Sequence, residues 1–388
     1  MINSTQLQMQ DLSKMSFPQT WEVLEEGIQK EVAPGFVVGV WWVQSPLDFW
    51  AGCLGQRRKI PSPLPITVDT VFDFASVTKV FATASLAATL VERGWLDWET
   101  PLSSLFGDYP YSRIQISHLL SHTAGLVAWH PFWEKLRERF LPALLEKISV
   151  DQRQRAMQEL VFEVTPQFLP GKQMIYSDLS FLLLGFALEK VTAMPLDQAV
   201  KKFVWEPMGI QEAFYRRLSS PRKPLDFVAA TEDCPWRGGV LQGEVHDDNC
   251  WSMGGYGGHA GAFGTVRDLM HFSRSLMVGR FLSPKVLKKF WTRVSNPLGC
   301  TRTLGWDMSS GENSAMGGAF APHSVGHLGF VGTSLWIDPE VGVAVSLLSN
   351  RVHPSRDNIK IKAFRPLFHR AIRVDLENSF RIKSFYGH

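Results

Sequence analysis

Strand-like hydrophobic patterns lie near both ends of this chain. Residues 36–43 form an apolar, β-rich run that is typical of a buried strand, and residues 49–54 follow closely enough to pair back with it. Near the other end, residues 325–330, 334–337 and 341–348 form three such runs separated by turn residues. The pattern predicts an antiparallel sheet built from both termini.

Helix-like patterns flank these runs and fill the middle of the chain. Residues 17–32, 265–277 and 358–372 each read as a helix. Residues 114–208 are mostly helical with loops at prolines, and residues 216–258 are polar, glycine-rich and irregular. The predicted fold class is therefore α+β, with helices flanking the sheet and a mostly helical subdomain inserted between its two parts.

The length of 388 residues is enough for two intimately packed subdomains. We expect an α/β subdomain of residues 17–110 plus 265–388, which contains the sheet. Residues 111–264 would form the inserted helical subdomain, and the cleft between the two subdomains is a natural place for an active site.

Composition narrows the possible partners. A hydrophobic content of 45%, a charged content of 20% and a net charge of +3 describe an ordinary globular protein with no electrostatic case for nucleic acid or an anionic membrane. The four cysteines are widely separated, which fits neither a disulfide scaffold nor a metal site. We therefore expect reduced thiols and no metal.

The first residues of the chain are polar, without a basic segment followed by an apolar one, so we see no signal peptide. No stretch is long and apolar enough to cross a bilayer. We therefore expect a cytoplasmic protein, although a trimmed signal sequence would overturn this expectation. The sequence leaves the oligomeric state open.

The segment 73–94 carries the most informative chemistry. It is apolar nearly all round, which predicts a buried helix, with Asp73 able to cap its start and Gly94 able to end it. Ser76 and Lys79 would share one helix face, where a buried amine of lowered pKa can activate a serine hydroxyl. The alternative is a helix start with an incidental lysine. The same spacing recurs at 220–223, but there it lies between prolines.

Two further segments could supply catalytic groups. Tyr176 precedes an apolar helix over residues 179–191, and its phenol could relay a proton; an ordinary tyrosine at a helix start is the alternative. His327 lies between two glycines on a predicted strand, where a backbone N–H beside a nucleophile can bind an oxyanion. A strand merely weakened by its glycines fits equally well.

Other polar clusters favour structural roles. His118 and His122 are four residues apart at a helix end, where an interaction with the helix dipole is favoured over metal binding. The acidic segment 246–249 lacks the ligand spacing of a calcium or zinc loop. The glycine-rich segment 254–261 lacks a preceding strand, so we expect a tightly packed loop instead of a phosphate site.

Together and in this order, the motifs resemble those of the serine β-lactamase and penicillin-binding-protein superfamily. The resemblance is nearest to the class C β-lactamase-like branch, which includes D,D-peptidases and family VIII carboxylesterases, and runs from about residue 34 to residue 353. The motifs are Phe74-Ala75-Ser76-Val77-Thr78-Lys79, the segment 116–126, Tyr176-Ser177-Asp178, Gly258-His259-Ala260-Gly261 and the segment 326–333 that contains Gly326-His327-Leu328-Gly329-Phe330.

The resemblance implies a role for each motif. Ser76 would be the acylated nucleophile, Lys79 would accept its proton, and Tyr176 would relay a proton to the leaving group. The backbone N–H groups of Ser76 and Phe330 would form the oxyanion hole, with Gly329 beside it. No cofactor is implied.

Two positions depart from the β-lactamase pattern. Asp178 stands where the family usually has asparagine; a carboxylate cannot donate to a substrate carbonyl, and beside Lys79 it would raise the lysine pKa. His327 stands where a lysine is usual, and a histidine is mostly neutral at pH 7. We therefore expect weak selection for an acidic substrate end and poor turnover of penicillins.

The sequence thus predicts a serine hydrolase that acts through an acyl-enzyme on a small ester or amide. The alternative is a D-Ala-D-Ala carboxypeptidase or D-amino-acid peptidase on the same scaffold. A non-catalytic binding protein of this fold is a third hypothesis, which the intact set of Ser76, Lys79 and Tyr176 disfavours.

Overall fold

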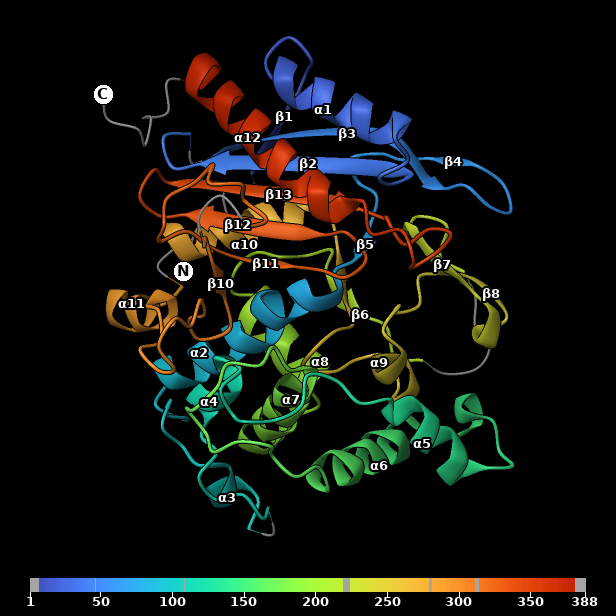
Figure 1. The fold of residues 1–388 in the computed structure, drawn as a ribbon, viewed down its shortest axis with the longest axis vertical. Coiled ribbons are helices and arrows are strands. Elements are labelled where there is room, and N and C mark those ends of the chain that lie inside the picture. The colour runs from blue at the N-terminus through green and yellow to red at the C-terminus, as the bar shows by residue number, and fades with distance from the viewer. Residues whose placement is uncertain are drawn as a thin grey trace.

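The computed structural model describes residues 7–380 apart from 46, 108, 219–223, 279–280 and 311–313. Its main element is an eight-stranded sheet that contains strands from both ends of the chain (Figure 1). All of its pairs are antiparallel except the edge pair β1–β3. In spatial order the strands are β1 (Gln8–Asp11), β3 (Asp48–Arg58), β2 (Gly35–Trp42), β13 (Val343–Ser349), β12 (Ser334–Asp338), β11 (Val325–Leu328) and β10 (Asp307–Met308), with β4 (Leu64–Pro65) paired to β3. The predicted fold class is confirmed.

The central strand β2 is buried on both faces because its side chains alternate between two cores. Val37 and Trp41 belong to the larger core, whereas Phe36, Val38 and Val40 belong to the smaller one. A continuous apolar run is expected for a strand that is covered on both sides.

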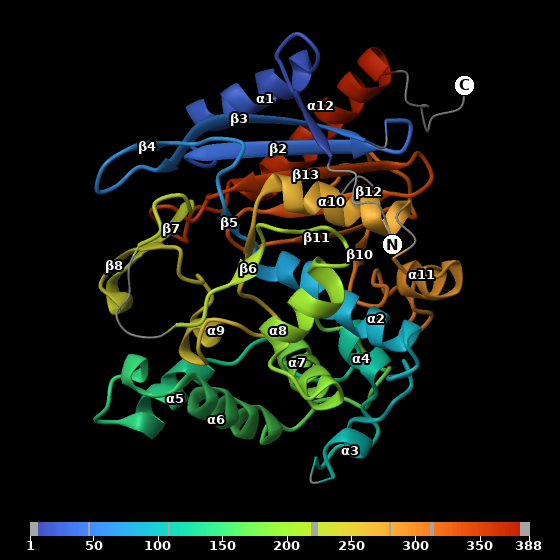
Figure 2. The ribbon, with the colours of Figure 1, turned by 180° about the vertical axis from the view of Figure 1, so that it is seen from behind.

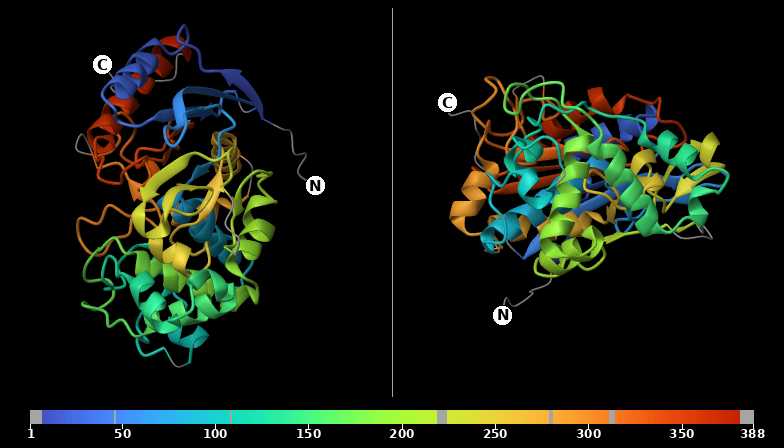
Figure 3. Two further views of the ribbon diagram at one scale, coloured as in Figure 1. Left: turned by 90° about the vertical axis from the view of Figure 1, so that its right-hand side faces the viewer. Right: turned by 90° about the horizontal axis from the view of Figure 1, so that it is seen from below.

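Helices from both ends of the chain cover one face of the sheet. In the side view of Figure 3, α1 (Pro18–Gln29) and α12 (Ile361–Phe380) form an outer layer over the strands. Gly27 allows their close approach, since a Cβ there would lie 2.7 Å from the ring of Phe364. The opposite face is covered by α10 (Val266–Met277), which packs against β2 and β13 and runs along the sheet in Figure 2.

The remaining helices lie mostly on the α10 side of the sheet (Figure 1). They are η1 (Ala75–Val77), η2 (Lys79–Ala84), α2 (Ser85–Glu92), α3 (Leu102–Leu105), α4 (Ile116–Leu120), α5 (Phe132–Phe140), η3 (Leu145–Lys147), α6 (Val150–Phe162), α7 (Asp178–Thr192), α8 (Leu196–Val200), η4 (Lys201–Trp205), η5 (Pro235–Arg237), α9 (Asp248–Ser252) and α11 (Pro284–Trp291). The proposed subdomain boundaries stay a prediction.

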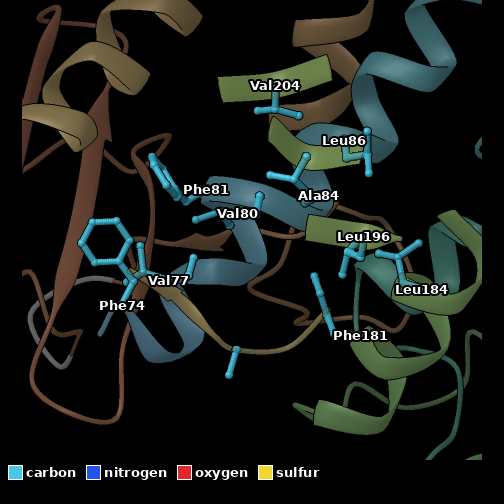
Figure 4. Close-up of a cluster of buried hydrophobic side chains, with 14 of the residues drawn as sticks. Phe74, Val77, Val80, Phe81, Ala84, Leu86, Phe181, Leu184, Leu196 and Val204 are labelled. Carbon is cyan, nitrogen blue, oxygen red and sulfur yellow. The ribbon is translucent and has the colours of Figure 1, made fainter. Parts of the chain in front are cut away.

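The segment predicted as one helix over 73–94 is three consecutive pieces. It begins with the 3-10 turn η1, continues as the π-helix η2 and becomes α-helical only in α2, while Asp73 ends strand β5 (Phe72–Asp73). The predicted end is confirmed, because Gly94 adopts a φ of +70° directly after the last turn. The burial is also as predicted: Figure 4 shows side chains of this segment packed against those of α7, α8 and η4.

The segment 216–258, predicted as irregular, contains short regular elements in its described part. Strands β7 (Ala230–Cys234) and β8 (Gly239–Gln242) form a hairpin. Separately, β9 (Ala262–Gly264) pairs with both β5 and β6 (Phe214–Tyr215). The second Ser-x-x-Lys copy at 220–223 lies outside the described residues.

In the part of the chain that the structure describes, no single helix has the length and hydropathy of a membrane span. The bent pair of Asp178–Thr192 and Leu196–Trp205 passes that test together, by length and composition only.

Candidate active site

Ser76 sits in a constrained turn directly after β5. The preceding residue, Ala75, has a φ of +46°, a left-handed conformation that is unfavourable for a residue with a side chain. The carboxylate of Asp73 supports this turn by accepting a hydrogen bond of 2.8 Å from the Ala75 N–H. The prediction that Asp73 is the N-cap is wrong, because Phe74 takes that position and Asp73 ends the strand before it, although its carboxylate still holds the first N–H of the turn. The turn presents Ser76 to a cavity.

Lys79 is fully buried beneath Ser76. Its Nζ donates to Ser76 Oγ at 2.9 Å and to the carbonyl oxygen of His259 at 3.0 Å, and it lies 2.7 Å from Asp178 Oδ1. Burial alone would lower the pKa of Lys79, but the Asp178 carboxylate and Tyr176 outweigh it, so the pKa is raised. The predicted contact between Lys79 and Ser76 is present. The prediction that burial lowers the pKa of Lys79 is wrong, because the opposite effect that we expected of Asp178 is the larger one.

The loop that supplies the His259 carbonyl is packed as tightly as its glycines predicted. A Cβ on Gly258 would lie 2.0 Å from the carbonyl oxygen of Phe181. Only glycine fits there without moving the backbone. This packing fixes the acceptor that holds the amine of Lys79.

Tyr176 and Asp178 lie at the start of α7. Ser177 caps this helix by accepting a hydrogen bond from the Ser180 N–H. The ring of Tyr176 has its centre 5.1 Å from Lys79 Nζ and 5.9 Å from the ring centre of His327. The structure therefore brings together Ser76, Lys79, Tyr176, Asp178 and His327, as the motifs predicted.

His122 contacts both the ring of Tyr176 and the backbone of Ser177. Its Nδ1 accepts a hydrogen bond of 3.0 Å from the Ser177 N–H, and its ring centre lies 4.6 Å from that of Tyr176. Burial, followed by the charges of Arg302 and Lys79, lowers the pKa of His122 well below its usual value. The interpretation of His122 as a helix-dipole cation is therefore wrong, because the ring is neutral at pH 7.

The end of β11 brings a backbone amide next to the nucleophile. A Cβ on Gly329 would lie 2.6 Å from the carbonyl oxygen of Phe74, so glycine permits the strand to approach the turn that carries Ser76. Phe330 lies just beyond the strand, in a turn instead of on it. Among the described residues, neither the Ser76 N–H nor the Phe330 N–H donates to a protein acceptor. Two free amides at one cavity are what an oxyanion hole requires.

His327 is buried and neutral. Burial, with smaller effects of Arg302 and Lys79, lowers its pKa well below the usual value. Its Nδ1 lies 2.9 Å from the carbonyl oxygen of Leu328. The sequence prediction that this position offers no fixed positive charge at pH 7 agrees with this environment.

The cavity above these residues has a volume of about 640 Å³. Its lining includes Ala75, Ser76, Trp129, Tyr176, Asp178, His246, Asp247, Asp248, Ala260, Arg302, Asp307, His327, Leu328, Gly329, Phe330, Arg351, Arg356 and Arg365. These residues come from both of the segments that were predicted to flank a cleft. The size suits a small molecule or the end of a peptide.

Sequence reasoning missed Arg302 in this cavity. Its guanidinium carbon lies 5.1 Å from the ring centre of Tyr176, and its Nη2 lies 3.5 Å from Asp307 Oδ2. Its Nε and Nη1 are buried without a hydrogen-bond partner among the described residues. No motif surrounds Arg302 in the sequence, so nothing local could have identified it.

The acidic segment that begins at His246 is occupied by ion pairs. His246 Nε2 lies 3.2 Å from Glu232, and Asp247 lies 2.9 Å from His259 Nε2. Asp248 pairs with two arginines. Among the described residues, no three His, Cys, Asp or Glu side chains are placed to hold a metal ion.

The chain is similar to known proteins over most of its length. The model of the Beta-lactamase family matches residues 22–367. A protein of Salmonella paratyphi B named "Putative D-alanyl-D-alanine carboxypeptidase" is 30% identical over 329 residues, which cover 77% of this chain and 73% of that protein.

Solved structures share the fold. Unliganded simvastatin synthase (LovD) from Aspergillus terreus superimposes with a TM-score of 0.69 at 18% identity, over 94% of this chain and 99% of its own. EstCE1, described as a hydrolase with promiscuous acyltransferase activity, gives a TM-score of 0.69 at 19% identity, over 93% and 99%.

Proposed function

Because the chain belongs to the β-lactamase family of hydrolases, we propose that it is a serine hydrolase that forms an acyl-enzyme on Ser76. The observation that carries this proposal is the contact of 2.9 Å between Ser76 Oγ and Lys79 Nζ at the wall of a cavity. A small ester or amide is the substrate class that we favour.

In the proposed reaction, Ser76 Oγ attacks the substrate carbonyl carbon and its proton passes to the neutral amine of Lys79. The developing oxyanion accepts hydrogen bonds from the amides of Ser76 and Phe330. Tyr176 relays a proton to the leaving group. Water then attacks the acyl-enzyme, which releases the acid and returns a proton to Ser76.

The raised pKa of Lys79 limits this reaction at neutral pH. The amine must be neutral to accept a proton, and Asp178 favours the ammonium form. We therefore expect ester hydrolysis to increase toward alkaline pH.

The test is intact-protein mass spectrometry after incubation with a fluorophosphonate, together with hydrolysis of p-nitrophenyl acetate and butyrate. We expect one adduct, absent in Ser76→Ala, and a loss of turnover of about 10³-fold or more in that variant. Full hydrolysis by Ser76→Ala would contradict the proposal. No adduct and no turnover in the wild type would favour a binding protein of the same fold.

A D,D-carboxypeptidase is a second candidate, which the free nitrogens of Arg302 favour. Two buried guanidinium nitrogens, Nε and Nη1, have no hydrogen-bond partner among the described residues, which is a costly arrangement that a substrate carboxylate would relieve. The name of the Salmonella relative points to the same substrate class. Arg302 could thus supply the positive charge that His327 does not.

Release of D-alanine from an acylated D-Ala-D-Ala peptide tests this second candidate. If it is correct, Arg302→Met raises KM for the peptide by about 10-fold or more but leaves KM for p-nitrophenyl acetate, which has no carboxylate, nearly unchanged. No release of D-alanine by the wild type would leave the esterase as the only supported function.

A further inference from the structure

A buried arginine of the C-terminal helix contacts the turn that carries the proposed oxyanion-hole amide. Arg365, on α12, is 6% exposed. Its Nη2 donates to the carbonyl oxygen of Gly329 at 3.0 Å and to that of Thr333 at 2.8 Å. These two carbonyls lie on either side of Phe330, so one guanidinium ties both ends of the turn.

The carbonyl of Gly329 and the N–H of Phe330 belong to the same peptide group. In a planar trans peptide these two bonds point in opposite directions, so a donor fixed on the oxygen also fixes the direction of the N–H. A cationic donor on the oxygen polarises the group as well, which makes the N–H a stronger donor. Arg365 therefore acts on the Phe330 N–H through the carbonyl oxygen of Gly329, which belongs to the same peptide group.

The charge of Arg365 is retained in this buried position. Burial, with a smaller effect of Arg351, lowers its pKa to about 10, which leaves the guanidinium charged at pH 7. Its Nε has no partner among the described residues, so the contacts of Nη2 with the turn are its anchoring interactions there.

A second arginine holds the next peptide of the turn. Arg351 Nε donates to the carbonyl oxygen of Phe330 at 2.8 Å, and its guanidinium carbon lies 4.4 Å from the centre of the Phe330 ring. The ring of His246 stacks on that phenylalanine at 5.6 Å between centres. The peptides on both sides of the Phe330 Cα are thus held by guanidinium groups.

We propose that Arg365 is a positioning residue of the oxyanion hole, which orients and polarises the Gly329–Phe330 peptide so that its N–H is preorganised for the transition state. This inference rests on the proposed acyl-enzyme function for its catalytic consequence, although the orientation of the peptide does not depend on it. Preorganised donors contribute to kcat more than to substrate binding.

The test compares Arg365→Met with Arg373→Met, a matched control. Arg373 lies on the same helix, is 5% exposed and does not line the cavity. Active sites are titrated with the fluorophosphonate, so that loss of folded protein is not read as loss of rate. We expect kcat per titrated site to fall about 10- to 100-fold in Arg365→Met, with KM within about 3-fold, and to stay unchanged in Arg373→Met.

A second readout needs no catalysis. In protein labelled with ¹⁵N-phenylalanine, the Phe330 amide is assigned by its loss in Phe330→Leu. We expect its proton resonance to move upfield in Arg365→Met, because the peptide is less polarised, and to stay in place in Arg373→Met. Arg365→Lys, which keeps the charge, should lie between wild type and Arg365→Met in both readouts, and it serves as the variant if Arg365→Met does not fold.

Equal kcat per site in the Arg365 variants and in Arg373→Met would overturn the inference, whatever the amide resonance does. A wild type that is never acylated would instead refute the proposed function. In that case an unmoved Phe330 resonance would also overturn the orienting role of Arg365, and a shifted one would support it.

Discussion

At the scale of single residues, the contact between Lys79 and Asp178 decides how the site ionises. Two opposing effects act on the lysine: burial disfavours the ammonium, and a carboxylate at 2.7 Å favours it. The carboxylate prevails. A buried ion pair of this kind becomes costly when one partner is removed, so both residues are coupled in any reaction that moves the proton.

The first prediction concerns Asp178→Asn. Without the carboxylate, burial dominates and the pKa of Lys79 falls, so the neutral amine is present at lower pH. We expect the rising limb of the profile of kcat/KM against pH to move to lower pH by about 1–3 units. Hydrolysis of p-nitrophenyl butyrate between pH 5 and 10 measures this.

Asp151→Asn is the matched control, since Asp151 is also the acid in the first turn of a helix but lies on α6. We expect its profile to match that of the wild type. A profile of Asp178→Asn that coincides with both would show that Lys79 is not the base whose ionisation limits the rate.

Some residues of the site could be identified from neighbouring residues in the sequence, and others could not. Ser76, Lys79 and Tyr176 belong to short motifs whose spacing indicates their chemistry. Arg302 and Arg365 reach the site from distant parts of the chain, through contacts that only the folded structure creates. The net direction of the Lys79 pKa also depends on distances that no sequence pattern contains.

At the scale of elements, periodicity identified the main strands and helices but not the local form of the helix that follows Ser76. The apolar positions between residues 73 and 94 predicted burial correctly. The left-handed Ala75 and the π-helix η2 are local backbone departures that the spacing of apolar residues does not encode. Hairpin β7–β8 was missed because its strands have only five and four residues, too few to show an alternating pattern.

The second prediction concerns Gly329→Ala. The new Cβ would lie 2.0 Å from Thr333 Oγ1 and 2.6 Å from the carbonyl oxygen of Phe74, so the turn with Phe330 must move away from Ser76. We expect kcat to fall on the order of 100-fold and stability to fall by about 1–3 kcal/mol. Ester hydrolysis and urea unfolding measure the two effects.

Gly107→Ala controls for the substitution itself, since apart from the chain neighbours no described residue lies within 4 Å of a Cβ at that position and its φ is not left-handed. It should keep the activity and stability of the wild type. Normal turnover in Gly329→Ala would mean that the Phe330 amide does not serve the reaction.

At the scale of the whole molecule, ion pairs join distant segments beside the cavity. Glu232 on β7 contacts both His246, which precedes α9, and Arg356, which precedes α12. Burial by itself would raise the pKa of Glu232, but hydrogen bonds from these two partners lower it to about 2. A carboxyl group whose pKa is lower in the folded state stabilises the fold above its unfolded pKa, near 4.5.

The third prediction follows for Glu232→Gln. Its free energy of unfolding at pH 7 should be lower than that of the wild type by roughly 1–3 kcal/mol. The difference should shrink as the pH falls from about 4.5 toward 2, because the wild-type carboxylate becomes protonated there. Urea unfolding at several pH values measures it. Glu340→Gln, at an exposed position, should show no such difference, and a pH-independent deficit in Glu232→Gln would contradict the electrostatic explanation.

The centre of the sheet could be predicted because β2, β3, β11, β12 and β13 follow apolar runs bounded by turn residues near both ends of the chain. Strands β1, β4 and β10 are too polar or too short to give such a pattern. The end of α12 could not be placed, since the charged positions after Ile372 hide a helix whose buried Leu376 continues the apolar stripe. The boundaries of the two predicted subdomains stay a prediction.

The sheet also has a consequence for how this protein is made. Trp42 of β2 pairs with Val343 of β13, about 300 residues later in the chain. At translation rates of roughly 5–20 residues per second, β2 waits on the order of 15–60 s before its neighbour leaves the ribosome. During that time a strand that is apolar on both sides has one edge unpaired. We therefore expect the yield of folded protein to depend strongly on chaperones and on the temperature of expression.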